Sequence, residues 1–147
     1  MTPVLAPLAG RVVALASVPD PVFAGEMVGP GVAIDPARDE PVITVTAPIA
    51  GSVAVLHPHA FVVSEGETSV LVHLGLDTVA LGGAPFEVHT RVGERVRPGR
   101  RMITWNLAGI GALSPLVPVV ALGAAGVEAL AEVGATVAAG QRLFTLA

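Results

Sequence analysis

The stretch His59-Ala-Phe-Val-Val-Ser-Glu-Gly-Glu-Thr-Ser-Val-Leu-Val-His-Leu-Gly75 places two valine-rich runs on either side of a short polar segment that contains Gly66. Runs of this length, separated by a glycine-containing connection, are typical of a β-hairpin. If the turn is centred on Gly66, His59 lies directly opposite His73. Residues paired in this way have Cβ atoms about 4.5–5.5 Å apart. The hairpin therefore predicts two imidazoles side by side on one face of a sheet.

The same register gives the two imidazoles apolar neighbours. Side chains alternate between the faces of a strand, so residues 57, 59 and 61 share one face. Phe61 then lies opposite Leu71, next to the histidines. A shift of one residue in the register would send the two imidazoles to opposite faces, so the prediction depends on the length of the turn.

The rest of the chain has the same character. It has 17 Gly and 13 Pro in 147 residues, an excess over the roughly 12% of average usage, which favours short strands and sharp turns. We predict an all-β, antiparallel sandwich or barrel-like fold with short helical turns, in a single domain over residues 1–147. The expected strands are 4–6, 11–16, 31–35, 42–46, 51–56, 59–63, 69–74, 86–90, 101–104, 117–122 and 142–146. Helical turns are expected at 76–81, 106–113 and 126–132.

Two motifs occur twice in the chain, each time 41 residues apart. Ala-Pro-Leu-Ala-Gly at 6–10 is matched by Ala-Pro-Ile-Ala-Gly at 47–51. Val-Gly-Glu-Arg-Val-Arg-Pro-Gly at 92–99 is matched by Val-Gly-Ala-Thr-Val-Ala-Ala-Gly at 133–140. Two copies are too few for a solenoid. They predict pseudo-symmetric hairpins within a small sandwich or barrel.

The charge balance and the missing residue types exclude several functions. There are 12 acidic residues and 8 basic residues, all of them Arg, which gives a net charge of -4. Scattered arginines on an acidic chain do not predict a nucleic-acid partner. The absence of Cys excludes disulfides and thiolate zinc sites. The repeated motifs resemble biotinyl and lipoyl carrier domains, but the absence of Lys excludes a lysine-linked biotin or lipoate. We expect no cofactor.

One uncharged segment is long enough to cross a bilayer. Residues 102–127 contain no charged side chain, and about 20 apolar residues suffice for a spanning helix. Asn106, Pro115 and Pro118 interrupt the segment, however, and no basic cluster flanks it. We therefore expect buried strands and loops rather than membrane insertion. The N-terminus has no basic region followed by an apolar core, so we expect no signal peptide and a cytoplasmic location.

The histidines are the side chains whose ordinary pKa lies nearest neutrality. His57, His59 and His73 lie within seventeen residues, whereas His89 stands apart and is expected to be a solvated residue at a strand end. Three interpretations of the pair remain open. The two rings satisfy each other in a partly buried position; they form a zinc site with a carboxylate such as Asp77; or one is a nucleophile for a phosphoryl group that the other stabilises.

Longer motifs around these residues resemble the glucose-type enzyme IIA of the bacterial phosphoenolpyruvate:sugar phosphotransferase system. The motifs follow the order of that family and span roughly residues 4 to 146. The combination of His-Ala-Phe with a downstream Val-His-x-Gly-x-Asp-Thr-Val is highly specific and favours phosphoryl transfer. The matching segments are His59-Ala-Phe61, Val72-His-Leu-Gly-Leu-Asp-Thr-Val-Ala-Leu-Gly-Gly83, Pro85-Phe86, Val18-Pro-Asp-Pro-Val-Phe-Ala-Gly-Glu-Met-Val-Gly-Pro-Gly-Val-Ala-Ile34, Ala47-Pro-Ile-Ala-Gly51, Val92-Gly-Glu-Arg-Val-Arg-Pro-Gly99 and Pro118-Val-Val120.

The resemblance implies an antiparallel β-sandwich that carries a phosphoryl group, which makes the chain a phosphotransferase. The donor would be the phosphohistidine of the small carrier HPr, and the acceptor would be a cysteine on the IIB domain of a sugar permease. His73 would be the phosphorylated residue and His59 the second active-site histidine. No metal is required, although zinc could bind adventitiously at His59 and His73.

The resemblance also implies roles for residues around the pair. Asp20 and Asp77 would engage the arginine that flanks the histidine of HPr. Independently, Gly75 lets the backbone approach His73, and a carbonyl there would accept a hydrogen bond from Nδ1 and leave Nε2 free to attack. An apolar docking face is expected from Val22, Phe23, Met27, Val28, Phe61 and Leu71.

The chain departs from the family at His57, where a hydroxyl residue is common. We expect His57 to support His59 through a hydrogen bond or to be a third ligand of an adventitious metal. One alternative function is a zinc hydrolase similar to lysostaphin-type peptidases, with His57, His59 and His73 as ligands. Another is a regulatory binding module in which phosphorylation of His73 controls docking.

Overall fold

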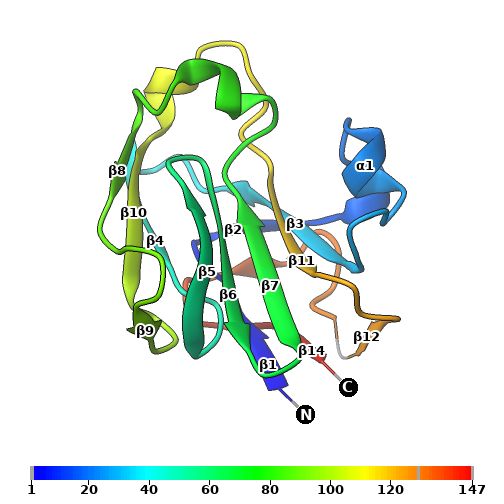
Figure 1. Cartoon of the computed structure of the whole chain (residues 1–147). Helices are drawn as coiled ribbons and strands as arrows, with labels where there is room; N and C mark the ends of the chain where they lie inside the picture. Colours follow the sequence, from blue (N-terminus) through cyan, green and yellow to red (C-terminus); the bar gives the residue numbers. More distant parts are fainter. Residues whose placement is uncertain (1, 129, 147) are drawn as a thin grey trace.

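The predicted all-β, antiparallel fold is confirmed. The structure is a computed structural model that describes residues 2–128 and 130–146, and every strand pair in that part of the chain is antiparallel (Figure 1). An eight-stranded sheet has the order β13-β2-β3-β11-β7-β6-β5-β9. Its strands are β2 (Gly10–Ala14), β3 (Gly31–Pro36), β5 (Gly51–His57), β6 (Ala60–Glu65), β7 (Thr68–His73), β9 (Arg95–Val96), β11 (Val117–Ala121) and β13 (Thr136–Val137).

Two three-stranded sheets pack on one face of the large sheet. Their orders are β1-β14-β12 and β4-β10-β8. Their inward side chains join those of the large sheet in one hydrophobic cluster. The strands are β1 (Thr2–Leu5), β4 (Val42–Thr46), β8 (Phe86–Val88), β10 (Arg101–Asn106), β12 (Val127–Glu128) and β14 (Arg142–Leu146).

Helical structure is short and local. The 3-10 turns η2 (Thr78–Leu81) and η3 (Leu107–Ile110) fall within the helical turns expected at 76–81 and 106–113. The turn η1 (Leu15–Ser17) and the four-residue helix α1 (Pro21–Ala24) were not expected. The helix expected at 126–132 is wrong for the described residues, where β12 forms instead, and residue 129 lies outside them.

The expected strands all occur, with ends that differ by about two residues at most, which is within the usual uncertainty of strand boundaries. The two-residue strands β9, β12 and β13 were missed because they are too short to show an alternating pattern. Among the described residues, no helix is long and apolar enough to span a bilayer. The uncharged segment 102–127 forms β10, η3, β11 and the start of β12.

The two repeated motifs are confirmed as a structural pseudo-symmetry. The Val12 backbone N–H donates to the Ala135 carbonyl oxygen over 2.8 Å, and Val53, 41 residues after Val12, donates to Glu94 over 2.9 Å. The strand order of the large sheet reads the same from both ends if β13, β2, β3 and β11 are equated with β9, β5, β6 and β7. The contiguous segment 42–106 thus forms one half of the pseudo-symmetric structure, and the segments before and after it form the other half.

The histidine-bearing hairpin β6–β7 has a different register from the one expected. Ala60, not His59, is paired with His73, and Phe61 is paired with Val72 rather than with Leu71. The cause is a two-residue turn at 66–67, whose centre lies between Gly66 and Glu67 rather than at Gly66 itself, so that Glu65 is paired with Thr68. Gly66 has a φ of 60°, which suits the first position of a type II′ turn, one of the turns that two-residue hairpins favour.

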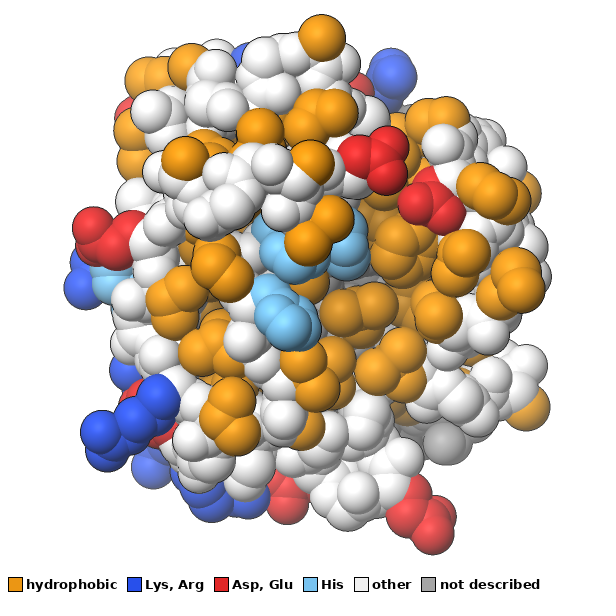
Figure 2. Space-filling model, turned by 45° about the horizontal axis from the view of Figure 1, so that its top comes forward, with side chains coloured by type: hydrophobic (Ala, Val, Ile, Leu, Met, Phe, Trp, Pro, Cys, Tyr) orange, Lys and Arg blue, Asp and Glu red, His pale blue; other side chains and the backbone are white. Residues whose placement is uncertain are grey.

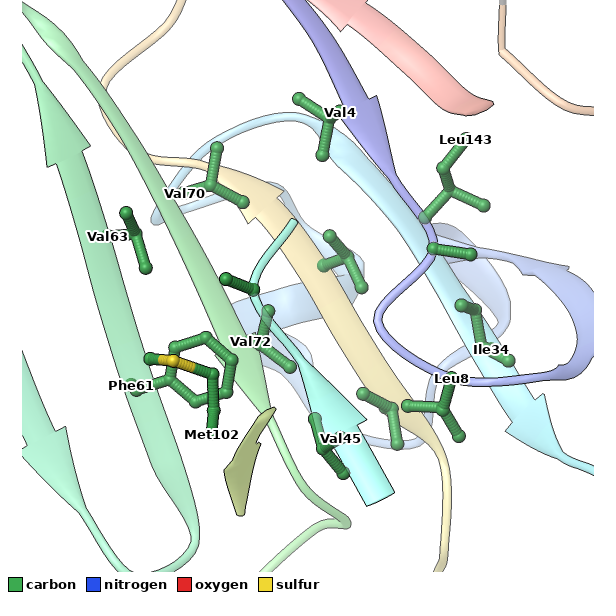
Figure 3. Close-up of a cluster of buried hydrophobic side chains, with 14 of the residues drawn as sticks. Val4, Leu8, Ile34, Val45, Phe61, Val63, Val70, Val72, Met102 and Leu143 are labelled. Atoms are coloured by element: carbon green, nitrogen blue, oxygen red, sulfur yellow. The ribbon is translucent and has the colours of Figure 1, made fainter. Parts of the chain in front are cut away.

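The corrected register turns Phe61 into the interior. Its side chain is fully buried in the main hydrophobic cluster together with Val63, Val70 and Val72. Figure 3 shows Phe61 among the buried side chains of this cluster, which also includes Met102. A ring of this size contributes strongly to the core, because burial of an aromatic side chain removes about 150–250 Å² from water.

Candidate functional site

His59 and His73 meet although they are not a directly paired couple. His59 lies in the two-residue turn between β5 and β6. The direction of its ring is therefore not fixed by the alternation of side chains along a strand. Its carbonyl oxygen accepts a hydrogen bond of 2.7 Å from the Leu74 backbone N–H, which holds the turn beside the end of β7. The two ring centroids are 5.1 Å apart, and the rings meet edge to face at 75°. The predicted imidazole pair therefore exists, on a different geometric basis from the one expected.

The tautomer of His73 is set by the backbone two residues later. Its Nδ1 atom lies 2.6 Å from the carbonyl oxygen of Gly75. A carbonyl oxygen can only accept a hydrogen bond, so Nδ1 carries the proton and donates it. In a neutral imidazole, Nε2 then keeps its lone pair and is free to act as a nucleophile.

Gly75 is required for this contact. Its φ is 80°, a region that residues with a Cβ atom rarely adopt. A Cβ atom at this position would lie 2.6 Å from Cγ2 of Thr78 and 2.9 Å from the carbonyl oxygen of Ser114. The Thr78 hydroxyl donates to the Leu74 carbonyl oxygen over 2.7 Å, which fixes the loop further.

Burial keeps both imidazoles uncharged near neutral pH. It lowers the pKa of His73 below the ordinary value of 6.5, against the opposing effects of the Gly75 hydrogen bond and of Asp20 and Asp77. It also lowers the pKa of His59, with further lowering from the charge that His73 and His57 carry when protonated. Both rings thus favour the neutral form, in which an imidazole nitrogen has a lone pair available.

Figure 2 shows histidine side chains gathered near the middle of one face, with hydrophobic side chains around them and acidic side chains beside them. The apolar floor next to His73 comes from a second hydrophobic cluster that includes Leu15, Phe23, Leu76 and Val120. The Phe23 ring lies 5.3 Å from the His73 ring, centroid to centroid. The loop that carries α1 thus lies against the histidine-bearing strand.

Several residues expected at the docking face are placed where a partner could reach them. Val22 is 43% exposed and Met27 is 74% exposed, whereas Val28 and Leu71 are half-buried. Phe23 is buried, although it contacts the His73 ring.

Phe61 is the exception, and its expected place on the docking face is wrong. Its side chain points into the core because the register differs by one residue. Val55, Val62 and Leu71 are paired across β5, β6 and β7 on the face that carries His73. Sequence reasoning missed Val55 and Val62, and the signal that could have found them is the length of the turn at 66–67.

The two carboxylates lie at the edge of the site. Asp20 precedes α1, and its carboxylate accepts a hydrogen bond of 3.0 Å from the Val22 backbone N–H. Asp77 is exposed and has a φ of 60°, an uncommon value for a residue with a side chain. Both carboxylates act on the pKa of His73, which places their negative charge near its ring.

His57 and His89 occupy different surroundings. His57 is exposed, and its ring stacks on that of His59 with centroids 5.6 Å apart and planes at 24°. His89 lies apart from the three clustered histidines; its Nε2 atom is 2.6 Å from the Thr104 hydroxyl, and its side chain is 15% exposed. His89 is therefore more buried than the solvated strand-end residue that we expected.

The described residues offer no group of three or more His, Asp or Glu side chains arranged to hold a metal ion. A catalytic zinc site normally has three protein ligands and an open position. The geometry instead provides one oriented nucleophilic nitrogen and a second imidazole beside it. A β-sandwich with such a pair on an accessible apolar face has the features of a phosphohistidine carrier.

Comparison with known proteins agrees with this class. The sequence model of the phosphoenolpyruvate-dependent sugar phosphotransferase system, EIIA 1 family matches residues 2–125. The chain belongs to this family. It is therefore a phosphoryl-relay component of sugar uptake and falls in the transferase class.

Individual relatives are similar over most of the chain. The glucose-specific EIIA component of Oceanobacillus iheyensis is 38% identical over 122 residues, which cover 80% of this chain and 72% of the relative. The glucose-specific EIICBA component of Streptococcus pneumoniae is 45% identical over 106 residues, 70% of this chain, and the chain spans only 14% of that longer protein. The glucose permease IIA from Mycoplasma capricolum has a structure that matches 97% of this chain and 93% of its own, with a TM-score of 0.86 and 30% identity. Neither the hydrolase nor a purely regulatory module is supported by these similarities.

Proposed function

We propose that Nε2 of His73 accepts a phosphoryl group from phosphorylated HPr and passes it to a cysteine on the IIB domain of a sugar permease. The observation that carries this assignment is the 2.6 Å contact between His73 Nδ1 and the Gly75 carbonyl oxygen, which leaves Nε2 unprotonated. In the first step, the Nε2 lone pair attacks phosphorus while the donor P–N bond breaks, and the donor nitrogen keeps the electron pair. In the second step, a thiolate sulfur attacks phosphorus, and the electron pair of the P–Nε2 bond returns to Nε2.

His59 is proposed to stabilise the phosphoryl oxygens. Phosphoryl transfer passes through a loose transition state, so positioning and charge stabilisation provide most of the catalysis. The edge of one of the two rings faces the other ring 5.1 Å away, centroid to centroid. An N–H of His59 within reach of a phosphoryl oxygen would donate to it, and the negative charge of that group would favour a proton on His59.

The same face is proposed to receive both partners. Val22 and Met27 offer exposed apolar surface next to the site. Asp20 and Asp77 offer negative charge for an arginine beside the donor histidine of HPr. A small apolar surface of this kind suits a carrier that has to release each partner. A cytoplasmic location and a single domain over residues 1–147 are part of the same proposal.

The test is to incubate the protein with phosphorylated HPr and to map the labelled residue. We expect label on His73, no label in His73→Gln, and retained label in His59→Gln with impaired transfer to IIB. The loss of onward transfer should be about 10²–10⁴-fold, since positioned groups that stabilise proton or charge transfer contribute in this range. Label on His59, or none on the unaltered protein, would contradict the assignment.

A further inference from the structure

Five of the eight arginines lie within residues 91–101, in and around the short edge strand β9. This segment has one acidic residue, Glu94, so its net charge is +4, whereas the rest of the chain has three arginines and eleven acidic residues and a net charge of -8. The segment directly precedes the uncharged stretch 102–127, so the expectation that no basic cluster flanks that stretch is wrong. The arginine patch is defined as Arg91, Arg95, Arg97, Arg100 and Arg101.

The pseudo-symmetry of the fold provides a comparison for this segment. Residues 132–142 lie 41 positions later in the chain and form the same backbone hydrogen bonds. The Glu94 N–H donates to the Arg91 carbonyl oxygen over 3.1 Å, and the Ala135 N–H donates to that of Glu132 over 3.0 Å. The second turn of each segment is closed by a bond of 3.1 Å in both copies. The two segments therefore have equivalent backbones.

The side chains of the two segments differ in charge. At the positions of the arginine patch, the second segment keeps a single arginine, and its net charge is zero. Equivalent turns thus form without the other four arginines, so the backbone fold does not require them. The residues that replace the patch are, in the same order, Glu132, Thr136, Ala138, Gln141 and Arg142.

Two members of the arginine patch have acidic partners within the chain. Arg95 forms an ion pair of 2.7 Å with Glu65, and Arg100 forms one with Glu94. Among the residues that the structure describes, the other three form no ion pair, and all three are exposed. The guanidinium groups that remain available to an external anion are those of Arg91, Arg97 and Arg101.

The patch lies at the end of the large sheet opposite to the histidines. Arg95 of β9 is paired with Ser52 near the start of β5, whereas His57 is the last residue of that strand. Five strand positions separate Ser52 from His57, which corresponds to about 17 Å. Figure 1 shows β9 at the lower left, and Figure 2 shows arginine side chains (blue) at the lower left of the histidine-bearing face. A surface that binds the patch therefore leaves the histidines accessible.

We propose that the arginine patch binds an anionic lipid surface, in which the phosphates of the headgroups accept hydrogen bonds from its guanidinium groups. The choice of a membrane rests on the proposed function, because the acceptor domain of a sugar permease works at the membrane that the permease crosses. Guanidinium groups bind phosphate oxygens through paired N–H donors. The protein lies on the headgroups and inserts no helix between them.

The charge distribution suits a lipid surface better than other polyanions. A segment of +4 beside a remainder of -8 makes the protein strongly dipolar, and this turns the patch toward a negative surface as the protein approaches it. Segment 91–101 has no aromatic side chain on which nucleic-acid bases could stack. Val92, in the first turn, is 62% exposed, so it adds an apolar side chain that can lie between headgroups.

Two triple variants separate the patch from the net charge. The patch variant removes the arginines that have no ion pair in the described part of the chain: Arg91→Gln, Arg97→Gln, Arg101→Gln. The control variant removes the three arginines outside the patch: Arg11→Gln, Arg38→Gln, Arg142→Gln. Each variant loses three positive charges, which takes the net charge from -4 to -7. Circular dichroism should show that both keep the fold, because all six side chains are exposed.

Binding is measured by co-sedimentation with vesicles of phosphatidylcholine alone and of phosphatidylcholine mixed with phosphatidylglycerol. We expect the unaltered protein to bind only the mixed vesicles, and to dissociate from them in about 1 M salt, where the Debye length is about 3 Å. The patch variant should bind about 10²-fold more weakly, since each arginine near an anionic leaflet contributes a factor of about five. The control variant should stay within about threefold of the unaltered protein, because its charges lie farther from the lipid and are screened.

Equal binding of the patch variant and the unaltered protein would overturn the proposal. Equal losses in the two triple variants would also overturn it, because net charge alone would then explain the binding. Equal binding to the two kinds of vesicle would show that the lipid charge is not recognised. If the protein bound neither kind, a lipid partner would be wrong, and the patch would be assigned to an acidic protein instead.

Labelling of His73 by phosphorylated HPr gives a separate measurement. We expect the same labelling rate on mixed vesicles as in solution, because the patch and the histidines lie at opposite ends of β5. A strong loss of labelling on vesicles would show that lipid covers the histidines and would overturn the proposed orientation. If the unaltered protein is not labelled even in solution, the proposed function fails, whereas the sedimentation result still decides whether the patch binds lipid.

Discussion

The carbonyl oxygen of Gly75 accepts a hydrogen bond of 2.6 Å from Nδ1 of His73. This contact joins a strand end to the loop that follows it, and it decides which ring nitrogen is available for chemistry. The loop can approach so closely because residue 75 has no Cβ atom and has a φ of 80°. The reactive nitrogen of the site is thus set by a backbone group.

Gly75→Ala should therefore damage both stability and phosphoryl acceptance. The new Cβ atom would lie 2.6 Å from Thr78 Cγ2, and a strained backbone of this kind costs about 1–3 kcal/mol. The free energy of unfolding, measured in urea, should fall by this amount, and labelling by phosphorylated HPr should slow. Gly66→Ala is the control, since its φ of 60° is similarly unfavourable but no atom lies within 4 Å of the added Cβ. Equal labelling rates in the two variants would contradict this account of Gly75.

Substitution of Phe61 should mainly affect stability, whereas substitution of Val55 should mainly affect the KM for phosphorylated HPr. Phe61→Ala removes a fully buried ring and should lower the free energy of unfolding by about 3–5 kcal/mol. Val55 is 42% exposed on the histidine-bearing face, so Val55→Ser should change stability by less than about 0.5 kcal/mol. It should instead raise the KM for phosphorylated HPr a few-fold, as truncation of a contact residue worth about 1 kcal/mol would do. If the KM for phosphorylated HPr changed in Phe61→Leu but not in Val55→Ser, Phe61 rather than Val55 would be a residue of the docking face, and this prediction would be contradicted.

Acidification should destabilise the fold through the histidine pair. The pKa values of His59 and His73 are below the 6.5 of an unfolded histidine. As the pH falls through 6.5, the unfolded chain takes up protons that the folded protein does not, so the free energy of unfolding decreases. The stabilisation is fully present above that pH. In urea unfolding, the free energy of unfolding of the double variant His59→Gln, His73→Gln should depend less on pH between 8 and 5. An unaltered dependence on pH would contradict the lowered pKa values of the two histidines.

The pseudo-symmetry predicts equal effects at two distant turns. Gly93 and Gly134 are 41 residues apart, and each has a φ of 91°. A Cβ atom added at either position would meet nothing within 4 Å, so the cost of an alanine comes from the backbone alone. Each substitution should lower the free energy of unfolding by about 1–2 kcal/mol. A difference between the two variants of more than about 1 kcal/mol would show that the turns are not equivalent, because the two glycines have the same φ and equally open surroundings.

Strand positions could be predicted from the sequence because alternating and β-branched runs between Gly and Pro residues carry a strong local signal. The repeats at 6–10 and 47–51 likewise predicted pseudo-symmetric hairpins. The histidine pair was also predicted, since His59 and His73 flank a hairpin and a family motif includes both. Local sequence was sufficient for these features because each depends on neighbouring residues or on a motif that is repeated in the chain.

Register and burial required the folded structure. Whether the turn is centred on Gly66 or between Gly66 and Glu67 depends on the φ of Gly66 and on the packing of β6 and β7 against the core. That shift of one residue in the register decides which side of the sheet Phe61 occupies. His57 and His73 come to share one face only when β5, β6 and β7 align His57, Ala60 and His73. The pattern of residue types along the chain specifies which segments become strands. Contacts between segments far apart in the chain decide the register in which those strands pair, because the free energy that selects the register comes from burying one face of the sheet.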